Sequence, residues 1–147
     1  MSLFDYSATH LFEDVPTGNT SLFRIKTGSR GIDVLVPFSS DGQLLVEVET
    51  EMTFSDGGTE ETIYQRNEMN DNTTNVEAYY SPTVDTTGDT IAEGWIPGGG
   101  QGANKIGGRA GEGDTLGFKP DTEHLVKLTN TSGSDSDIFV KVLFDEV

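Results

Sequence analysis

The chain has 147 residues without a break in composition, so we expect one domain with a single hydrophobic core. Its 25 acidic residues against 9 basic ones give a net charge of −16, which repels nucleic acid and anionic membrane surfaces. The absence of cysteine excludes disulfides, thiolate metal sites and thiol catalysis. Such an acidic balance suits a protein that works in high salt, where charges are screened.

The first residues, MSLFDYSATHLFEDV, lack the basic and then apolar pattern of a secretory signal. No apolar run approaches the ~18–20 residues that span a bilayer. We therefore expect a soluble protein with neither a nucleic acid nor a membrane as partner. Residues 1–14 are nevertheless too apolar for a solvated tail, because they contain Leu3, Phe4, Tyr6, Leu11 and Phe12. We predict an N-terminal arm over 1–14, docked on its own domain or on a partner.

Beyond the arm, residues 15–147 are predicted to form a single β-sandwich domain. Short stretches alternate apolar and polar residues with a period of two, and turn sequences rich in Gly, Asp and Ser separate them. Regularly spaced short strands favour an all-β, antiparallel, jelly-roll-like sandwich. The strands are expected at 22–26, 31–38, 44–54, 62–66, 75–80, 90–96, 115–118, 124–130 and 137–144.

The last of these strands has two apolar faces. Ile138, Val140 and Val142 share one face, while Phe139 and Leu143 lie with Lys141 on the other. We expect the second face to be partly buried, against another subunit.

Residues 97–113, PGGGQGANKIGGRAGEG, hold eight of the chain's 18 glycines. The segment does not fit a phosphate-binding loop, because Lys105 follows Asn104 and Ile106 stands where Ser or Thr is required. The pattern predicts a long surface loop, serving as a connection or as a contact surface.

Residues capable of catalysis are few. His10 and His124 have no nucleophile motif beside them, and zinc-binding patterns are absent. Glu47, Glu49 and Glu51 alternate along one strand, where the carboxylate pair of a glycosidase is conceivable, but a solvated face is the simpler interpretation. We predict no catalytic residues, no metal and no cofactor.

Calcium is a further possibility, because Asp85 and Asp89, and Asp135 and Asp137, place hard oxygen ligands at two turns. Neither turn has the spacing of a calcium loop, so we interpret these residues as caps of backbone donors. The N-glycosylation pattern occurs at Asn19, Asn72 and Asn130, and the sequence does not decide its use.

Trp95, the only tryptophan, enters the Gly-rich segment. Together with Tyr64, Tyr79 and Tyr80 it could form an aromatic platform for sugars. A single Trp in this position more often anchors a loop to the core, so we favour a buried Trp95.

The order and spacing of several short motifs over residues 44–144 resemble a widespread family of small structural proteins of tailed viruses, the capsid decoration or cement proteins. The matching pieces are Tyr64, Arg66 and Asn67, the Asn/Thr run, Pro82-Thr83-Val84, Pro97-Gly98-Gly99 with Asn104, and Lys119-Pro120 ahead of Leu125, Thr129-Asn130 and Gly133. Family members are usually less acidic and close on aromatic residues, whereas this chain ends LFDEV. The acidity fits a virus of a halophilic archaeon.

The resemblance implies a homotrimer on the outer surface of an icosahedral head, bound to the major capsid protein at threefold positions. Its contact residues, with the capsid or between subunits, would then come from the arm and the Gly-rich segment: Leu3, Phe4, Tyr6, Leu11, Phe12, Trp95, Pro97, Gly98, Gly99 and Asn104. A virion-exposed carbohydrate-binding module, a tail-associated protein and a glycan-degrading enzyme remain as alternatives.

Overall fold

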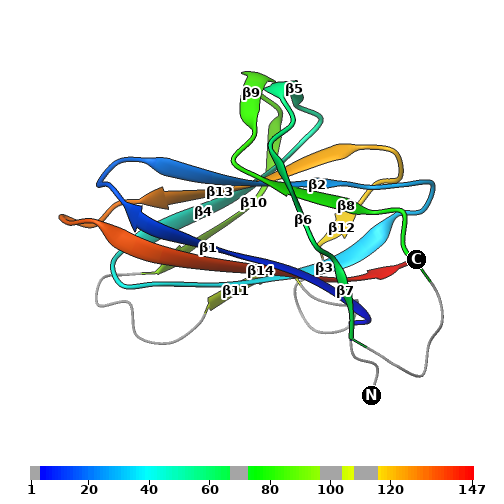
Figure 1. Ribbon diagram of the computed structural model, residues 1–147, viewed down its shortest axis with the longest axis horizontal. Coiled ribbons are helices and arrows are strands. Elements are labelled where there is room, and N and C mark those ends of the chain that lie inside the picture. The colour runs from blue at the N-terminus through cyan, green and yellow to red at the C-terminus, as the bar shows by residue number, and fades with distance from the viewer. Residues whose placement is uncertain (1–3, 67–72, 97–103, 108–115) are drawn as a thin grey trace.

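The computed structural model describes residues 4–66, 73–96, 104–107 and 116–147, and nearly all of its regular structure is β-strand. Two antiparallel six-stranded sheets pack face to face, as the two layers of Figure 1 show. The predicted all-β sandwich is therefore confirmed. No described segment is a helix with the length and hydropathy that crossing a bilayer requires.

Sheet A has the strand order β11-β3-β14-β1-β7, with β12 also beside β3. Its strands are β1 (Tyr6–Val15), β3 (Ile32–Ser40), β7 (Tyr64–Gln65), β11 (Asn104–Gly107), β12 (Gly117–Phe118) and β14 (Ser136–Glu146). Sheet B has the order β10-β4-β13-β2-β8-β6. Its strands are β2 (Thr20–Lys26), β4 (Leu44–Thr50), β6 (Thr59–Glu61), β8 (Glu77–Tyr80), β10 (Asp89–Ile96) and β13 (Glu123–Asn130).

Eight strands form four antiparallel pairs between segments that are distant in the sequence, and each pair lies within the sequence span of the one before it. β1 pairs with β14, β2 with β13, β3 with β11, and β4 with β10. The first strand of the set thus meets the last, and the chain changes sheet between consecutive strands except from β4 to β10. This is the connectivity of a jelly roll.

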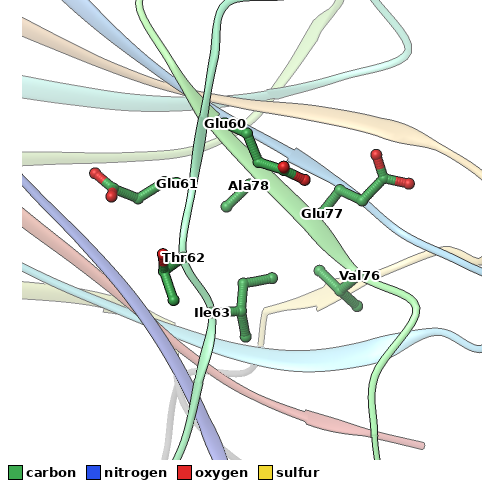
Figure 2. A pocket seen from close by; sticks show the side chains of 7 residues that line it. All are labelled: Glu60, Glu61, Thr62, Ile63, Val76, Glu77 and Ala78. Atoms are coloured by element: carbon green, nitrogen blue, oxygen red, sulfur yellow. The ribbon is translucent and has the colours of Figure 1, made fainter.

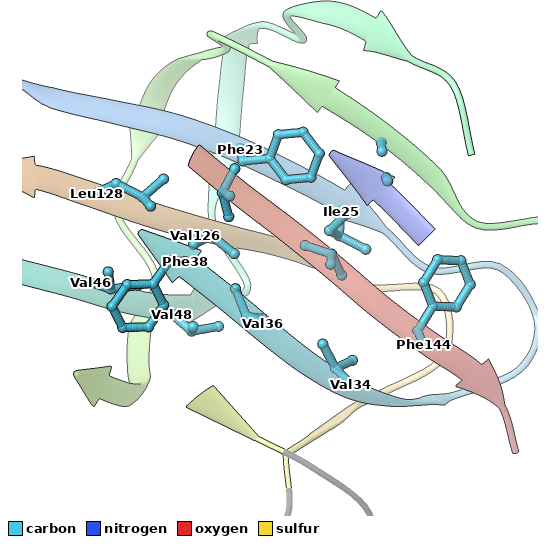
Figure 3. Packing of buried hydrophobic residues seen from close by; sticks show 14 of the residues in the cluster. Phe23, Ile25, Val34, Val36, Phe38, Val46, Val48, Val126, Leu128 and Phe144 are labelled. Carbon is cyan, nitrogen blue, oxygen red and sulfur yellow. The ribbon is translucent and has the colours of Figure 1, made fainter. Parts of the chain in front are cut away.

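The core lies between the sheets and is formed by every second residue of the long strands. Figure 3 shows these side chains converging from both layers, and they are almost fully buried. The labelled examples are Phe23, Ile25, Val34, Val36, Phe38, Val46, Val48, Val126, Leu128 and Phe144.

An insertion between β4 and β10 contains β5 to β9, whereas β12 lies between β11 and β13. β5 (Thr53–Asp56) pairs with β9 (Thr83–Thr86), and this two-stranded ribbon projects above sheet B in Figure 1. The predicted single strand over 44–54 is wrong, because Glu51 adopts a left-handed φ of 66° and separates β4 from β5.

The N-terminal segment is paired into the sandwich as strand β1. Tyr6 to Phe12 pair in register with Phe144 to Ile138, and Phe4, Tyr6 and Phe12 are buried. Of the two dockings left open, the segment thus takes the one on its own domain, as a strand that the sequence did not predict because Ala8 and His10 occupy inward positions that usually carry stronger apolar markers. Leu3 lies outside the described residues.

The Gly-rich segment also contains a strand. Asn104 to Gly107 form β11, which pairs with Phe38 to Leu35 of β3. The prediction of an uninterrupted loop over 97–113 is therefore wrong for these four residues. Pro97, Gly98 and Gly99 lie outside the described part of the chain.

Candidate functional site

His10 joins the two sheets. Its Nδ1 lies 2.7 Å from Glu61 Oε1, and its ring stacks on Tyr80 with centroids 4.0 Å apart. Phe12 meets the same ring edge-on. Because β1 belongs to sheet A and β6 and β8 to sheet B, these contacts tie one edge of the sandwich together, which is a structural role.

His124 is buried in β13, with an exposed fraction of 1%. Its ring stacks on Phe118, and its Nδ1 has no hydrogen-bond partner. Burial lowers the pKa of His124 to about 4, so the imidazole is neutral at pH 7. The two histidines therefore lie in different sheets, each packed against aromatic rings.

The three glutamates predicted to share a solvated face do not do so. Glu49 is 5% exposed, and its Oε2 lies 3.0 Å from Lys127 Nζ. Glu51 lies beyond the end of β4 and pairs with Lys119, whose ammonium group lowers the pKa of the Glu51 carboxyl. Glu47 is instead the direct cross-strand neighbour of Glu93 on β10.

Of the Asp residues interpreted as caps of backbone donors, Asp137 has such a contact in the structure. Its Oδ1 accepts the backbone N–H of Asp14 at 2.9 Å, as the capping interpretation predicted. In the described ranges, no group of three or more His, Asp and Glu residues is arranged to hold a metal ion. Of the glycosylation patterns, Asn130 is fully buried and its amide donates to the carbonyls of Val15 and Ser134, so the folded protein cannot be modified there.

A hollow of about 220 Å³ opens beside β6 and β8 (Figure 2). Its lining combines carboxylates with apolar groups: Glu60, Glu61, Thr62, Ile63, Val76, Glu77 and Ala78. Two of these carboxylates already have partners within the chain, because Glu61 contacts His10 and Glu77 accepts the Tyr79 hydroxyl. That hydrogen bond raises the pKa of Tyr79 to about 12.

The aromatic residues do not form a common platform. Trp95 lies on β10 and Tyr79 on β8, and three strands separate them in sheet B, roughly 19 Å at the usual strand spacing. Tyr80 points inward to His10, whereas Tyr79 packs against Arg24. Tyr64 lies on β7 of the other sheet.

Trp95 is 49% exposed, so the prediction of a buried core anchor is wrong. It lies on the outer side of β10, opposite Leu45 of β4, and β10 is the last described strand at that edge of sheet B. Ile91, at the register shift between Thr90 and Ala92, is 41% exposed, and Glu93 lies between Ile91 and Trp95 along the strand. We call the exposed residues of β10, Ile91, Glu93 and Trp95, the β10 surface.

A second apolar surface lies on the outer side of sheet A. Leu11 of β1 and Phe139 of β14 are direct cross-strand neighbours there, with exposed fractions of 47% and 37%. We call this the sheet A outer face; its central positions are Ser7, Thr9, Leu11, Leu35, Pro37, Ser39, Phe139, Lys141 and Leu143. The predicted second face of β14 is part of it.

The predicted contact residues are thus divided. Leu11 and Trp95 are exposed, on opposite sheets, whereas Phe4, Tyr6 and Phe12 are buried within the sandwich. Asn104 begins β11 at the edge of sheet A. Leu3, Pro97, Gly98 and Gly99 cannot be placed, because they lie outside the described residues.

No protein-family model and no curated protein matches the chain. Among solved structures it is similar to a crystal structure of PirA, with 11% identity, 93% of each chain covered and a TM-score of 0.44. It is also similar to the cowpea mosaic virus top component, with 13% identity, 98% of this chain and 82% of that chain covered, and a TM-score of 0.27. For the infectious bursal disease virus VP2 subviral particle the identity is 11%, the coverage 99% of this chain and 40% of that chain, and the TM-score 0.19. The neighbours thus include viral capsid proteins, but likenesses this weak identify no family.

Proposed function

We propose that this protein is a virion structural protein that decorates the icosahedral head of a tailed virus. It binds the major capsid protein at threefold positions as a homotrimer, on the outer surface of the head. The observation that carries the proposal is the placement of large exposed apolar side chains on both sheets, Leu11 and Phe139 on one and Trp95 on the other. A protein that contacts both a lattice and its own copies needs two such surfaces.

The β10 surface is the part that faces the capsid in this proposal. Tryptophan is strongly enriched among the side chains that dominate binding energy, and Trp95 lies two residues before the Gly-rich segment of the family resemblance. An edge strand also presents backbone donors and acceptors that a partner strand can use. Trp95 and Ile91 would be covered on binding.

Decoration requires no catalysis, which fits the purely structural contacts of His10 and His124. We propose that the protein is not an enzyme and uses no cofactor. A ligand that binds only the expanded capsid lattice stabilises that lattice by mass action. The net charge of −16 fits a halophilic host, because a Debye length of about 3 Å at 1 M salt removes repulsion between neighbouring copies.

Cosedimentation with heads stripped of accessory proteins tests the proposal. Wild type should bind in 2 M salt, and Trp95→Ala should bind at least about tenfold more weakly. Val147→Ala is the control, because it shortens an exposed apolar side chain that directly follows β14, away from the β10 surface. This variant should bind like wild type. Failure of wild type to bind at low and at high salt would refute the proposal. Binding to isolated tails, without binding to heads, would instead support a tail-associated structural protein.

A virion-exposed carbohydrate-binding module is the second candidate. The observation that favours it is the half-exposed Trp95 beside Glu93, whose cross-strand neighbour is Glu47. An aromatic face next to carboxylates can stack on a sugar ring and accept its hydroxyl hydrogen bonds. Retention on a glycan array, lost in Trp95→Ala, would support this candidate, whereas a decoration protein should ignore sugars and bind heads.

A further inference from the structure

Residues 59–66 cross one edge of the sandwich from sheet B to sheet A, and we call them the strap. They form β6, pass through Thr62 and Ile63, and then form β7. Figure 1 shows this segment running across both layers. Among the described strands, β6 and β7 are the last at this edge of their sheets. The strap therefore covers the neighbouring edges of β8 and β1, with which these two strands pair.

Three sets of contacts hold the strap in place. Where it starts, β6 pairs with β8. Where it leaves sheet B, Glu61 Oε1 lies 2.7 Å from Nδ1 of His10, which belongs to sheet A. Where it ends, β7 pairs with the start of β1, and Arg66 donates its side-chain Nη1 to the carbonyl of Phe4 and its backbone N–H to that of Asp5.

The strap itself buries little apolar surface. Its exposed residues are Thr59, Glu60, Thr62, Tyr64, Gln65 and Arg66. Ile63 packs against the core and is only partly buried. The hollow of about 220 Å³ lies between residues 60–63 of the strap and residues 76–78 at the start of β8 (Figure 2). Few buried apolar contacts and solvent-exposed backbone hydrogen bonds characterise segments that open before the rest of a fold.

A glycine turn precedes the strap. Gly57 and Gly58 connect β5 to β6, and Gly58 adopts a left-handed φ of 90°. A Cβ at Gly58 would lie 2.6 Å from the carbonyl oxygen of Tyr80, so the turn requires glycine. Arg24 holds the carbonyl of Gly57 on the side of the ribbon. Gly58 is thus placed to act as a hinge between a fixed ribbon and the strap.

We infer that the strap opens and closes as one unit over this edge, and that the contact between His10 and Glu61 is its latch. Thr62 and Ile63 pair with neither sheet, so the latch holds the strap where both strand ladders are interrupted. Stacking on Tyr80 fixes the His10 ring in position for this contact. The opening is a property of the free protein and does not depend on binding to a head.

Closing the strap protects the edges of both sheets. A sheet edge presents backbone N–H and C=O groups that can pair with another chain, and native proteins protect such edges by covering them. In the closed form, β6 occupies the edge of β8 and β7 occupies the start of β1. Opening would expose both edges, together with Val76 and Ala78, which are buried when the strap is closed. The latch thereby controls access to this edge of the sandwich.

Amide hydrogen exchange of the folded protein in 2 M salt, followed by NMR, tests the latch. The backbone N–H of Arg66 reports on the far end of the strap, because it donates to Asp5 in the closed form. Glu61→Ala removes the carboxylate and should speed exchange at Arg66 at least about fivefold. Amides of the central strand β13, at Val126 and Leu128, should exchange as in wild type.

Glu60→Ala is the matched control. It makes the same substitution one residue earlier in β6, at an exposed side chain that forms no hydrogen bond or salt bridge with the described residues. Exchange at Arg66 should equal that of wild type. His10→Phe keeps a ring against Tyr80 but removes Nδ1, so it should act like Glu61→Ala. Combining the two changes should add little, because both remove the same contact.

A disulfide provides a second test that leaves the latch intact. Ser7 and Tyr64 are direct cross-strand neighbours of β1 and β7, and the chain has no cysteine. Opposite positions in an antiparallel pair are close enough for a disulfide, so Ser7→Cys with Tyr64→Cys can fasten the strap when oxidised. Oxidation should slow exchange at Arg66 at least about fivefold, and reduction should restore the rate of the reduced variant.

The outcomes are distinct. Exchange at Arg66 that is the same in wild type and Glu61→Ala would overturn the inference, as would exchange that the oxidised disulfide does not slow. Equal acceleration at Arg66, Val126 and Leu128 would also overturn it, because the whole fold and not the strap would then be opening. Head binding is measured separately, so its failure would refute the proposed function and leave the strap unaffected.

Discussion

The ring of Phe118 stacks on the imidazole of His124, with centroids 3.9 Å apart and ring planes within 6° of parallel. The stack joins β12 of sheet A to β13 of sheet B. Because burial lowers the pKa of His124 from 6.5 to about 4, the unfolded chain binds a proton between these values that the folded chain excludes.

The stability contributed by neutral His124 should therefore be complete above pH 6.5 and decrease as the pH falls toward 4. The expected loss is about 3 kcal/mol, at 1.36 kcal/mol for each unit of pKa difference. Urea unfolding of wild type and His124→Gln at pH 7.5 and 4.5 measures it, because protonation of carboxylates affects both proteins alike. A pH dependence that is equal in the two proteins would contradict the prediction.

Arg24 holds the β5–β9 ribbon against sheet B. Its guanidinium lies over the rings of Phe54 and Tyr79, donates to both carboxylate oxygens of Glu123 at 2.9 and 2.6 Å, and donates to the carbonyl of Gly57. Lysine cannot reproduce this planar, bidentate arrangement.

We expect Arg24→Lys to reduce the free energy of unfolding by about 1–3 kcal/mol and to speed amide hydrogen exchange in the ribbon. Arg30→Lys is the control, because Arg30 is exposed and donates to one backbone carbonyl, that of Val147. Unchanged exchange at Phe54 in Arg24→Lys would show that another contact holds the ribbon.

Gly88 permits a close approach between the start of β10 and the end of β4. A Cβ at this position would lie 2.1 Å from the carbonyl oxygen of Thr50, which is backbone and cannot turn aside. Gly88→Ala should therefore destabilise the protein by at least about 2 kcal/mol. Gly133→Ala, where a Cβ meets nothing within 4 Å, should change stability by less than about 0.5 kcal/mol. Equal denaturation midpoints for the two variants would refute the close approach.

The exposure of Trp95 leads to a prediction opposite to that for a core tryptophan. Trp95→Ala should cost less than about 1 kcal/mol of stability, because no core contact is removed. As the chain's only tryptophan, it should emit as a solvated indole and shift to the blue when heads are added. A loss of 3 kcal/mol or more in chemical denaturation would place Trp95 in the core after all.

Periodicity in the sequence predicted the long strands well, because a strand with one buried face must alternate. The expected strands at 90–96 and 124–130 agree within one residue with Asp89–Ile96 and Glu123–Asn130. β1 was missed because Ala8 and His10 carry its inward positions, and the break at Glu51 was missed because its conformation does not depend on hydropathy.

The alternation of apolar and polar residues along single strands predicted only part of the two candidate surfaces. The two apolar faces of β14 placed Phe139 and Leu143 together on the side away from Ile138, Val140 and Val142, as the register confirms. Burial of that side against another subunit stays a prediction. The exposure of Trp95 could not be predicted, because it depends on the position of β10 as the last described strand of sheet B, which follows from the pairing of distant segments. The absence of acidic residues from the central positions of the sheet A outer face could not be predicted from the sequence either. It depends on the pairing of β1, β3 and β14.

The most direct test of the central claim is the number of copies bound per head at saturation, measured by cosedimentation of wild-type protein with stripped heads in 2 M salt. Decoration at threefold positions predicts saturable binding at three copies for each such position. Absence of binding, or binding that does not saturate at a multiple set by the lattice, would contradict it.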